Sequence, residues 1–379
     1  MVINNVGVTF PKGFLASGIA CGLKNTAKKD LALIYSKNPA TAAAVFTKNS
    51  VWAAPLTVSF NHLKNKTIQA IIINSGNANC FTGKAGVSDA LVMCKMVASN
   101  LGIKENDVLV ASTGIIGKRL AIDKVRNGIP DLIENLSSLD EAGKNAAKAI
   151  LTTDTFIKQR AYKINFGKKS VAIGAMAKGS GMIAPNMATM LAFITTDAAI
   201  DKKILEKILN QAIDRSFNCI SVDGCMSTND FVSILANGVS GYKIQSKNDI
   251  KKFSTALNEI CLELSKDIIK DGEGRTKFIT IEINGLHSFE QAKKAGLAIA
   301  NSMLFKCACF GNNPNWGRIA AAIGAADLKV KEGDFKINMS FKGKDEVLVK
   351  VNFKQGKAKA IIYSTDLTPK YIAINAAYN

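Results

Sequence analysis

Residues 178–191 read Lys-Gly-Ser-Gly-Met-Ile-Ala-Pro-Asn-Met-Ala-Thr-Met-Leu, and this stretch decides the fold prediction. Its glycines give the backbone unusual freedom, while Pro185 fixes a bend and restricts the residue ahead of it. The apolar run 190–194 follows at once and predicts a buried core element. The pattern therefore indicates a glycine-rich arm that enters a rigid element at Thr189.

The histidines limit the chemistry that this segment can support. The chain has two, His62 and His287, and neither has a metal-ligand neighbour or lies in a nucleophile motif. Both are expected to be ordinary turn or surface residues, and no metal site is expected. Acyl transfer would then need another base, such as the α-amino group of an N-terminal threonine.

A cut before Thr189 would create that base. The Thr189 hydroxyl would attack the Ala188 carbonyl, an ester would form, and water would release it. The new α-amine has an ordinary pKa of about 7.7–8.0, which suits a base at neutral pH. The residues alone leave two other interpretations open. One is a Gly/Pro loop that leads into a buried strand or helix, and the other is a phosphate-binding loop that lacks the full Walker or Rossmann spacing.

Hydrophobic periodicity in the rest of the chain predicts an α+β protein. Apolar stripes at helical spacing occupy 90–101, 205–213 and 257–268. Strand-like runs occupy 68–73, 108–111, 278–283, 347–353 and 358–363, the last two read as an antiparallel pair. Because helices and strands do not alternate strictly, helices packed on sheets are favoured over a doubly wound fold.

Composition excludes several classes of protein. The 379 residues carry 49 Lys+Arg against 30 Asp+Glu, a net charge of +19, but no basic stripe is interleaved with aromatic residues. We therefore expect a lysine-rich surface that attracts small anions, and no nucleic-acid partner. Eight cysteines without a C-x-x-C pair indicate reduced, buried thiols, and neither a signal peptide nor a membrane span is predicted. A cytoplasmic protein with no membrane partner is expected.

The arm segment closely resembles the self-cleavage signature of the ornithine acetyltransferase (glutamate N-acetyltransferase) family. The resemblance covers nearly the whole chain. It departs from the family pattern at Arg275, at 225–226 and in a tail that ends early. Further matching segments are 30–34, 43–47, 74–79, 112–117, 152–155, 221–230, 271–278, 313–319 and 374–376.

The resemblance implies roles for particular residues. Thr189 is the expected nucleophile, and the bond between Ala188 and Thr189 is the expected cleavage site. Thr113 and Gly114 are expected to form the oxyanion hole, where one donor contributes about 2.7–4 kcal/mol in a related case. The residues expected to bind the amino-acid substrate, together with Thr189, are Thr152, Lys178, Glu273 and Asn375. Lys178 would pair with the substrate carboxylate, and Glu273, on an accessible loop, with its ammonium group.

The resemblance also implies an activity and an architecture. Acetyl would pass from N2-acetylornithine to glutamate through acetyl-Thr189 in a ping-pong reaction of arginine biosynthesis. No cofactor is implied, although acetyl-CoA is a further donor for some members. The alternative is a self-processing aminopeptidase or amidohydrolase of related fold. A layered sandwich over 1–285 and a smaller region over 286–379 are expected. The cut chains, 1–188 and 189–379, should form a heterotetramer of two α and two β chains.

Overall fold

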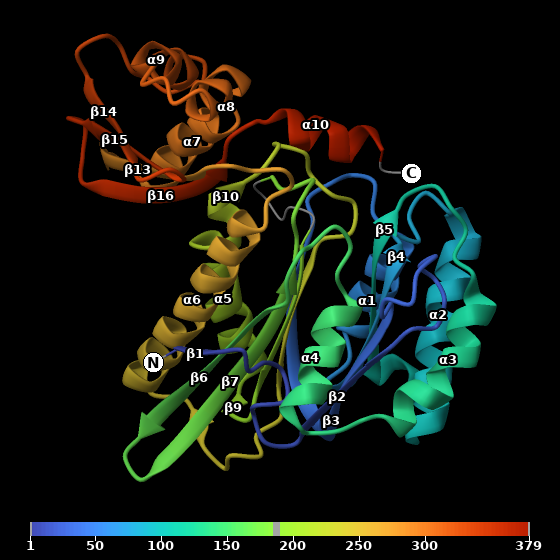
Figure 1. Ribbon diagram of the computed structural model, residues 1–379. Coiled ribbons are helices and arrows are strands. Elements are labelled where there is room, and N and C mark those ends of the chain that lie inside the picture. Colours follow the sequence, from blue (N-terminus) through green and yellow to red (C-terminus); the bar gives the residue numbers. More distant parts are fainter. Residues whose placement is uncertain (1, 185–189, 378–379) are drawn as a thin grey trace. The chain divides into compact units, whose positions relative to one another are not determined.

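The computed structural model describes residues 2–184 and 190–377 (Figure 1). These residues form two compact units. The first comprises 2–179, 190–215 and 227–264, and the second comprises 180–184, 216–226 and 265–377. Both units contain residues from before and after the expected cut at 188/189. No described helix is long and apolar enough to cross a membrane.

The first unit is built on a nine-stranded sheet. The strand order is β1-β6-β7-β8-β11-β3-β4-β5, and β2 pairs with β3 off this path. Strands β9 (Ala199–Ile200) and β12 (Lys243–Ile244) form a separate pair. The nine strands are β1 (Val2–Asn4), β2 (Phe14–Ile19), β3 (Leu31–Phe46), β4 (Ile68–Asn77), β5 (Val108–Ile115), β6 (Lys158–Phe166), β7 (Lys169–Lys178), β8 (Leu191–Thr196) and β11 (Phe231–Ala236).

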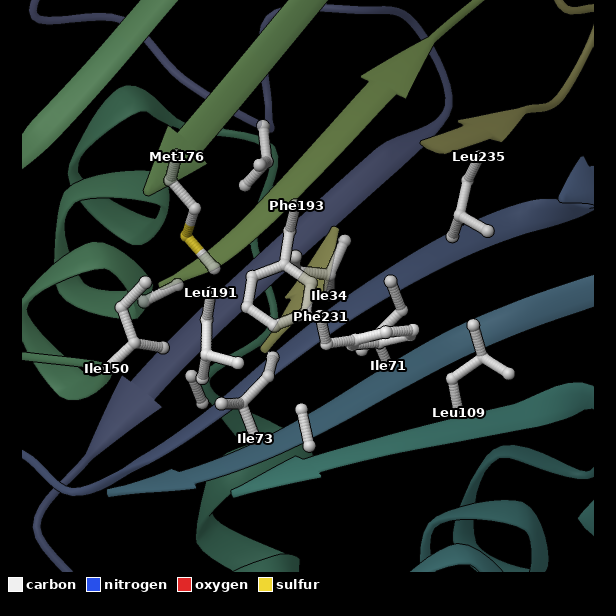
Figure 2. Close-up of a cluster of buried hydrophobic side chains, with 14 of the residues drawn as sticks. Ile34, Ile71, Ile73, Leu109, Ile150, Met176, Leu191, Phe193, Phe231 and Leu235 are labelled. Carbon is white, nitrogen blue, oxygen red and sulfur yellow. The ribbon is translucent and has the colours of Figure 1, made fainter. Parts of the chain in front are cut away.

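The long strand β3 folds this sheet into a sandwich. Its first part pairs with β4 and its last part, from Thr41 to Phe46, pairs with β11. Side chains from β4 and β5 therefore face those of β7, β8 and β11 across a shared core (Figure 2). Alternation along β4 fits this arrangement, because Ile71 and Ile73 enter that core while Ile72 faces the opposite side.

Helices cover the sheets of the first unit. The buried faces of α2 and α3 pack on the outer side of β3, β4 and β5, and α5 packs on β3. Their apolar residues recur every three or four positions, so each helix buries one face. The helices are α1 (Ala54–His62), α2 (Gly83–Leu101), α3 (Ile122–Glu134), α4 (Asp140–Ala149), α5 (Lys202–Asp214) and the first part of α6 (Lys247–Lys270); a 3₁₀ turn occupies Glu105–Asp107.

The second unit has its own core between a five-stranded sheet and helices α7 to α9. The strand order is β10-β16-β13-β15-β14. The elements are the 3₁₀ turn Phe217–Cys219, β10 (Ile220–Ser221), β13 (Phe278–Leu286), α7 (Phe289–Ala300), α8 (Met303–Phe310), α9 (Trp316–Gly324), β14 (Phe335–Lys342), β15 (Glu346–Phe353), β16 (Ala358–Thr365) and α10 (Pro369–Ala376).

These elements confirm the α+β prediction, the three helical stripes and the five strand positions. The apolar run after Thr189 is β8, an internal strand whose six residues are all buried. The predicted pairing of 347–353 with 358–363 is wrong, because β13 lies between β15 and β16. The connection is not a hairpin: the Gly356 N–H donates to the Gly285 carbonyl of β13 instead.

Three local expectations also need correction. His62 is buried at the end of α1, where its Nδ1 lies 2.7 Å from the Val108 carbonyl oxygen. Strand β13 continues past its predicted end at 283 through a β-bulge between Asn284 and Leu286. The expected border between 285 and 286 therefore falls within a strand of the second unit. Cys225 and Cys307 are exposed, although the described residues, which include every cysteine, contain no disulfide.

Candidate active site

The expected nucleophile and cleavage bond lie outside the described residues, since Ala188 and Thr189 fall within 185–189. Met190 is the first described residue after this segment, and its backbone N–H belongs to the peptide bond that follows Thr189. That N–H donates to Oδ1 of Asp230 at 3.1 Å. Asp230 is fully buried, and burial raises the pKa of its carboxyl well above the usual value. A buried carboxyl group therefore holds the backbone at the entry to β8.

The expected oxyanion residues end strand β5. Thr113 is buried, and Gly114 has φ +134°, a conformation that side chains rarely adopt. A Cβ on Gly114 would lie 2.4 Å from the carbonyl carbon of Gly76 in the neighbouring strand β4. The close approach of these two strand ends requires glycine at 114, which fits a position where backbone groups face a reacting oxygen.

A buried amide fixes this strand end. The Asn229 Nδ2 donates to the Ala78 carbonyl at 2.7 Å and to the Ser112 carbonyl at 2.9 Å. Ser112 directly precedes Thr113, so one side chain ties the ends of β4 and β5 together. Asn229 and Asp230 are neighbours in sequence: Asn229 holds the strand end that carries the expected oxyanion residues, and Asp230 holds Met190, which follows the expected nucleophile. Their segment matched the family resemblance, but no role had been assigned to either residue.

Lys178 and Thr152 come together at the end of β7. The Lys178 Nζ donates to Thr152 Oγ1 at 2.8 Å and lies 3.5 Å from Thr113 Oγ1. Only 2% of Lys178 is exposed, which excludes an ordinary surface lysine. The structure brings three expected site residues together, because Thr113 and Thr152 both lie within 3.5 Å of the Lys178 ammonium group.

Asp154 organises this cluster. Its Oδ1 accepts hydrogen bonds from the Lys158 Nζ at 2.8 Å and from the Gly179 N–H at 2.7 Å. Its Oδ2 accepts one from the Thr152 N–H at 3.1 Å and lies 3.8 Å from the Lys178 Nζ. Burial opposes ionisation, but the ammonium groups of Lys178 and Lys158 outweigh it and hold the pKa of Asp154 well below its usual range.

Several ammonium groups gather around the Asp154 carboxylate. The Nζ atoms of Lys158 and Lys178 lie 2.8 Å and 3.8 Å from its oxygens. Burial lowers the pKa of the nearby Lys24 ammonium group to about 8, Asp30 opposes this shift, and Lys178 contributes to it. These ammonium groups are the kind of partner that the carboxylate of an amino acid would need.

The second unit contains Glu273 and Asn375. The Asn375 Nδ2 donates to Glu273 Oε2 at 2.8 Å, so the two expected substrate residues contact each other. Glu273 is only 9% exposed, which corrects the expectation of an accessible loop. The Gly181 backbone passes so close that a Cβ there would lie 2.2 Å from Glu273 Oε2. A side chain at 181 would therefore displace the Glu273 carboxylate.

The described site residues thus form two groups. Thr113, Gly114, Thr152 and Lys178 belong to the first unit, while Glu273 and Asn375 belong to the second. Sequence reasoning assigned no role to Asp154, although an acidic residue beside Thr152 was an available signal. Among the described residues, no cluster of three or more His, Cys, Asp or Glu side chains could hold a metal ion.

Known proteins resemble the chain over nearly its full length. The ArgJ family model matches residues 15–344. The arginine biosynthesis bifunctional protein ArgJ of Oceanobacillus iheyensis is 43% identical over 400 residues, covering 100% of this chain and 97% of that protein. The glutamate N-acetyltransferase of Methanocaldococcus jannaschii is 43% identical over 403 residues, covering 98% of each.

Two solved structures match about half of this chain each. The arginine biosynthesis bifunctional protein of Bacillus halodurans is 43% identical, with a TM-score of 0.48, and covers 50% of this chain and 97% of its own. The ornithine acetyltransferase of Mycobacterium tuberculosis, complexed with ornithine, is 38% identical, with a TM-score of 0.46, and covers 49% and 97%. The family match and the two relatives aligned over nearly their full length establish that the chain belongs to the ArgJ family of acyltransferases in arginine biosynthesis.

Proposed function

We propose that this protein transfers acetyl from N2-acetylornithine to glutamate through an acetyl-Thr189 intermediate, after cutting its own chain before Thr189. The observation that carries the proposal is the buried cluster of Lys178, Thr152 and Thr113, which offers a cation and hydroxyl groups to an amino-acid substrate. The resemblance of 178–191 to the family's cleavage signature supplies the nucleophile.

Self-cleavage would proceed by an N-to-O acyl shift. The Thr189 hydroxyl oxygen attacks the Ala188 carbonyl carbon, the C–N bond breaks, and an ester with a free α-amine forms. Water then hydrolyses the ester, which leaves a carboxylate on Ala188 and an amine on Thr189. Donors from Thr113 and Gly114 would stabilise the negative oxygen in this step and in the later transfer.

Acetyl transfer would use the new amine as base. It accepts the Thr189 hydroxyl proton while the oxygen attacks the acetyl carbonyl of acetylornithine, and the proton then passes to the departing ornithine nitrogen. In the second half-reaction the amine of glutamate attacks the acetyl ester, the ester C–O bond breaks, and the proton lost by the glutamate nitrogen returns through the α-amine to the Thr189 oxygen. Lys178 and Thr152 would hold the substrate carboxylate, and Glu273 with Asn375 would hold its ammonium group.

The sheet supports lasting association of the cut chains. Strands β8 and β11, which follow the cut, pair with β7 and β3, which precede it. Cutting one bond outside these strands leaves their ladders intact. The half-length matches of the two solved chains also fit a processed protein. A cytoplasmic heterotetramer of two α and two β chains, with no cofactor and with acetyl-CoA as a candidate further donor, completes the proposal.

The intact mass of the purified protein tests the cleavage, and an ornithine-release assay tests the transfer. We expect fragments 1–188 and 189–379 from the wild type and one uncut chain from Thr189→Ala. Ornithine release from acetylornithine should depend on glutamate. Release that ignores glutamate would instead support an amidohydrolase. A fully active wild-type chain without a cut would refute the proposed base.

A further inference from the structure

Asp223 is the centre of a hydrogen-bond cluster in the second unit that the proposed chemistry does not use. Its Oδ2 accepts from the Met182 N–H at 2.6 Å and from the Tyr371 hydroxyl at 3.1 Å. Its Oδ1 accepts from the Ile183 N–H at 2.9 Å and from the Cys225 N–H at 3.0 Å. Two of these four donors, the N–H groups of Met182 and Ile183, belong to the glycine-rich arm that precedes the expected cut.

The same loop holds the arm from its carbonyl side. The Ile183 oxygen accepts from the Val222 N–H at 2.9 Å and from the Ser221 hydroxyl at 3.2 Å. Ile183 is fully buried, and Ala184 is nearly so. The backbone of residue 183 is therefore bound through both its N–H and its carbonyl oxygen to one short segment, 221–223.

The arm is also held in an unfavourable conformation. Met182 has φ +55°, which costs a residue with a side chain more than it costs glycine. Such strain persists only where the surroundings determine the backbone. Here the surroundings include the Asp223 carboxylate, which accepts the Met182 N–H directly.

We infer that Asp223 is a positioning residue for self-cleavage, which fixes the arm at 182–183 so that the Ala188 carbonyl is presented to the Thr189 hydroxyl. The inference rests on the proposed function, because it assumes that the bond before Thr189 is cut. It predicts that Asp223 controls the rate of cutting more strongly than the rate of acetyl transfer in chains that have been cut.

The variant Asp223→Asn tests this inference with little change in shape. An amide offers one acceptor oxygen, so two of the four donors would face an NH₂ group instead. Asp366→Asn is a matched control in the same unit. The Asp366 carboxylate accepts hydrogen bonds from the Thr276 N–H at 2.8 Å and the Lys277 N–H at 2.9 Å. Like Asp223, it therefore binds the backbone of two consecutive residues, but these lie outside the arm.

The full chains are made by cell-free synthesis, and the cut fraction is followed by intact mass after synthesis is stopped. We expect the half-time of cutting to rise at least tenfold in Asp223→Asn and to stay within twofold of wild type in Asp366→Asn. Asp223→Glu, which keeps the carboxylate but displaces it, should fall between wild type and Asp223→Asn. It provides the test if the amide variant does not fold.

Acetyl transfer is then measured on the cut portion of each variant. The kcat per cut chain should stay within about threefold of wild type. Wild-type cutting rates in both Asp223 variants would overturn the inference, and so would equal slowing in Asp366→Asn. A loss of kcat as large as the loss of cutting rate would overturn the assignment to the cleavage step. An uncut wild type would instead refute the proposed function.

Discussion

Removing the buried carboxylate with Asp154→Asn should weaken both the fold and the substrate site. The side chains of Asp154 and Lys158 are fully buried and their charged atoms are 2.8 Å apart. At an effective dielectric constant of about 20, this separation corresponds to an attraction of about 6 kcal/mol before the cost of burial. Loss of one partner from a buried pair typically costs about 3–5 kcal/mol, because the remaining charge loses its compensation.

The stability loss can be measured in the first unit alone. The chain has two tryptophans. Trp52 belongs to the first unit and stacks on Phe46 at 5.5 Å, whereas Trp316 belongs to the second unit. In a Trp316→Phe background, fluorescence therefore reports unfolding around Trp52. We expect Asp154→Asn to lower the free energy of unfolding in urea by about 3–5 kcal/mol relative to that background.

The same variant should impair substrate binding, because the Lys178 ammonium would lose the carboxylate 3.8 Å away. We expect kcat/KM for acetylornithine to fall about 10- to 100-fold, equivalent to about 1.4–2.7 kcal/mol. Lys158→Met is the control, since it leaves Asp154 beside Lys178. It should lose stability but retain most of its kcat/KM.

A double variant separates charge from packing. Asp154→Leu with Lys158→Met replaces the pair by apolar side chains, which is often neutral or stabilising. It should recover only part of the lost stability, because the Gly179 and Thr152 N–H groups also lose their acceptor. The kcat/KM should stay low, because Lys178 still lacks this carboxylate. An Asp154→Asn protein that loses less than about 1 kcal/mol would refute the reasoning about the buried pair. Unchanged kcat/KM would refute the link to Lys178.

The pH dependence of this effect has a definite sign. The pKa of Asp154 is held below its unfolded value of about 3.9. Its contribution to stability is therefore fully present above that value and is lost as the pH falls through the lower folded value. The stability difference between wild type and Asp154→Asn should be constant near neutral pH and should narrow below about pH 4.

Two further predictions concern the other expected site residues. Gly114→Ala should reduce kcat at least about 100-fold, because the strand end must move away from Gly76. Gly117→Ala is the control and should keep most activity, since Gly117 also has a positive φ (+82°) but an added Cβ there would meet no described atom within 4 Å. Equal losses of kcat in the two variants would contradict the reasoning. Glu273→Gln preserves the side-chain shape beside Asn375 but removes the negative charge, so KM for acetylornithine should rise about 10-fold or more in steady-state assays. An unchanged KM would exclude pairing of Glu273 with the substrate's ammonium group.

The sequence predicted those features that depend on local pattern. The run 190–194 became strand β8, because a continuous apolar segment fits a strand buried on both faces. The apolar runs 68–73 and 108–111 placed β4 and β5 correctly. Both strands nevertheless extend past these predicted ends, to Asn77 and Ile115. Buried side-chain partners replace water there, as when the Ser112 hydroxyl donates to Asn74 Oδ1 at 2.5 Å.

The features that the sequence could not predict depend on contacts between distant residues. Whether Lys178 is a surface charge or a buried ligand is decided by Asp154, 24 positions earlier, since a lysine is buried only where its charge is compensated. The pairing of β15 and β16 with β13 is decided by a strand more than 60 residues before them. The resemblance supplied the site residues, but it named none of the carboxylates that hold them.

The proposed cut would fall just ahead of a firmly held strand. Strand β8 is paired on both sides, with β7 and β11, and these pairings do not involve the bond before Thr189. The entry to β8 is held by Asp230, which accepts the Met190 N–H. The proposed cut would therefore leave β8 and its neighbours paired. Because the amine and the hydroxyl of a terminal threonine belong to one residue, a firmly held strand directly after it would favour proton transfer between them.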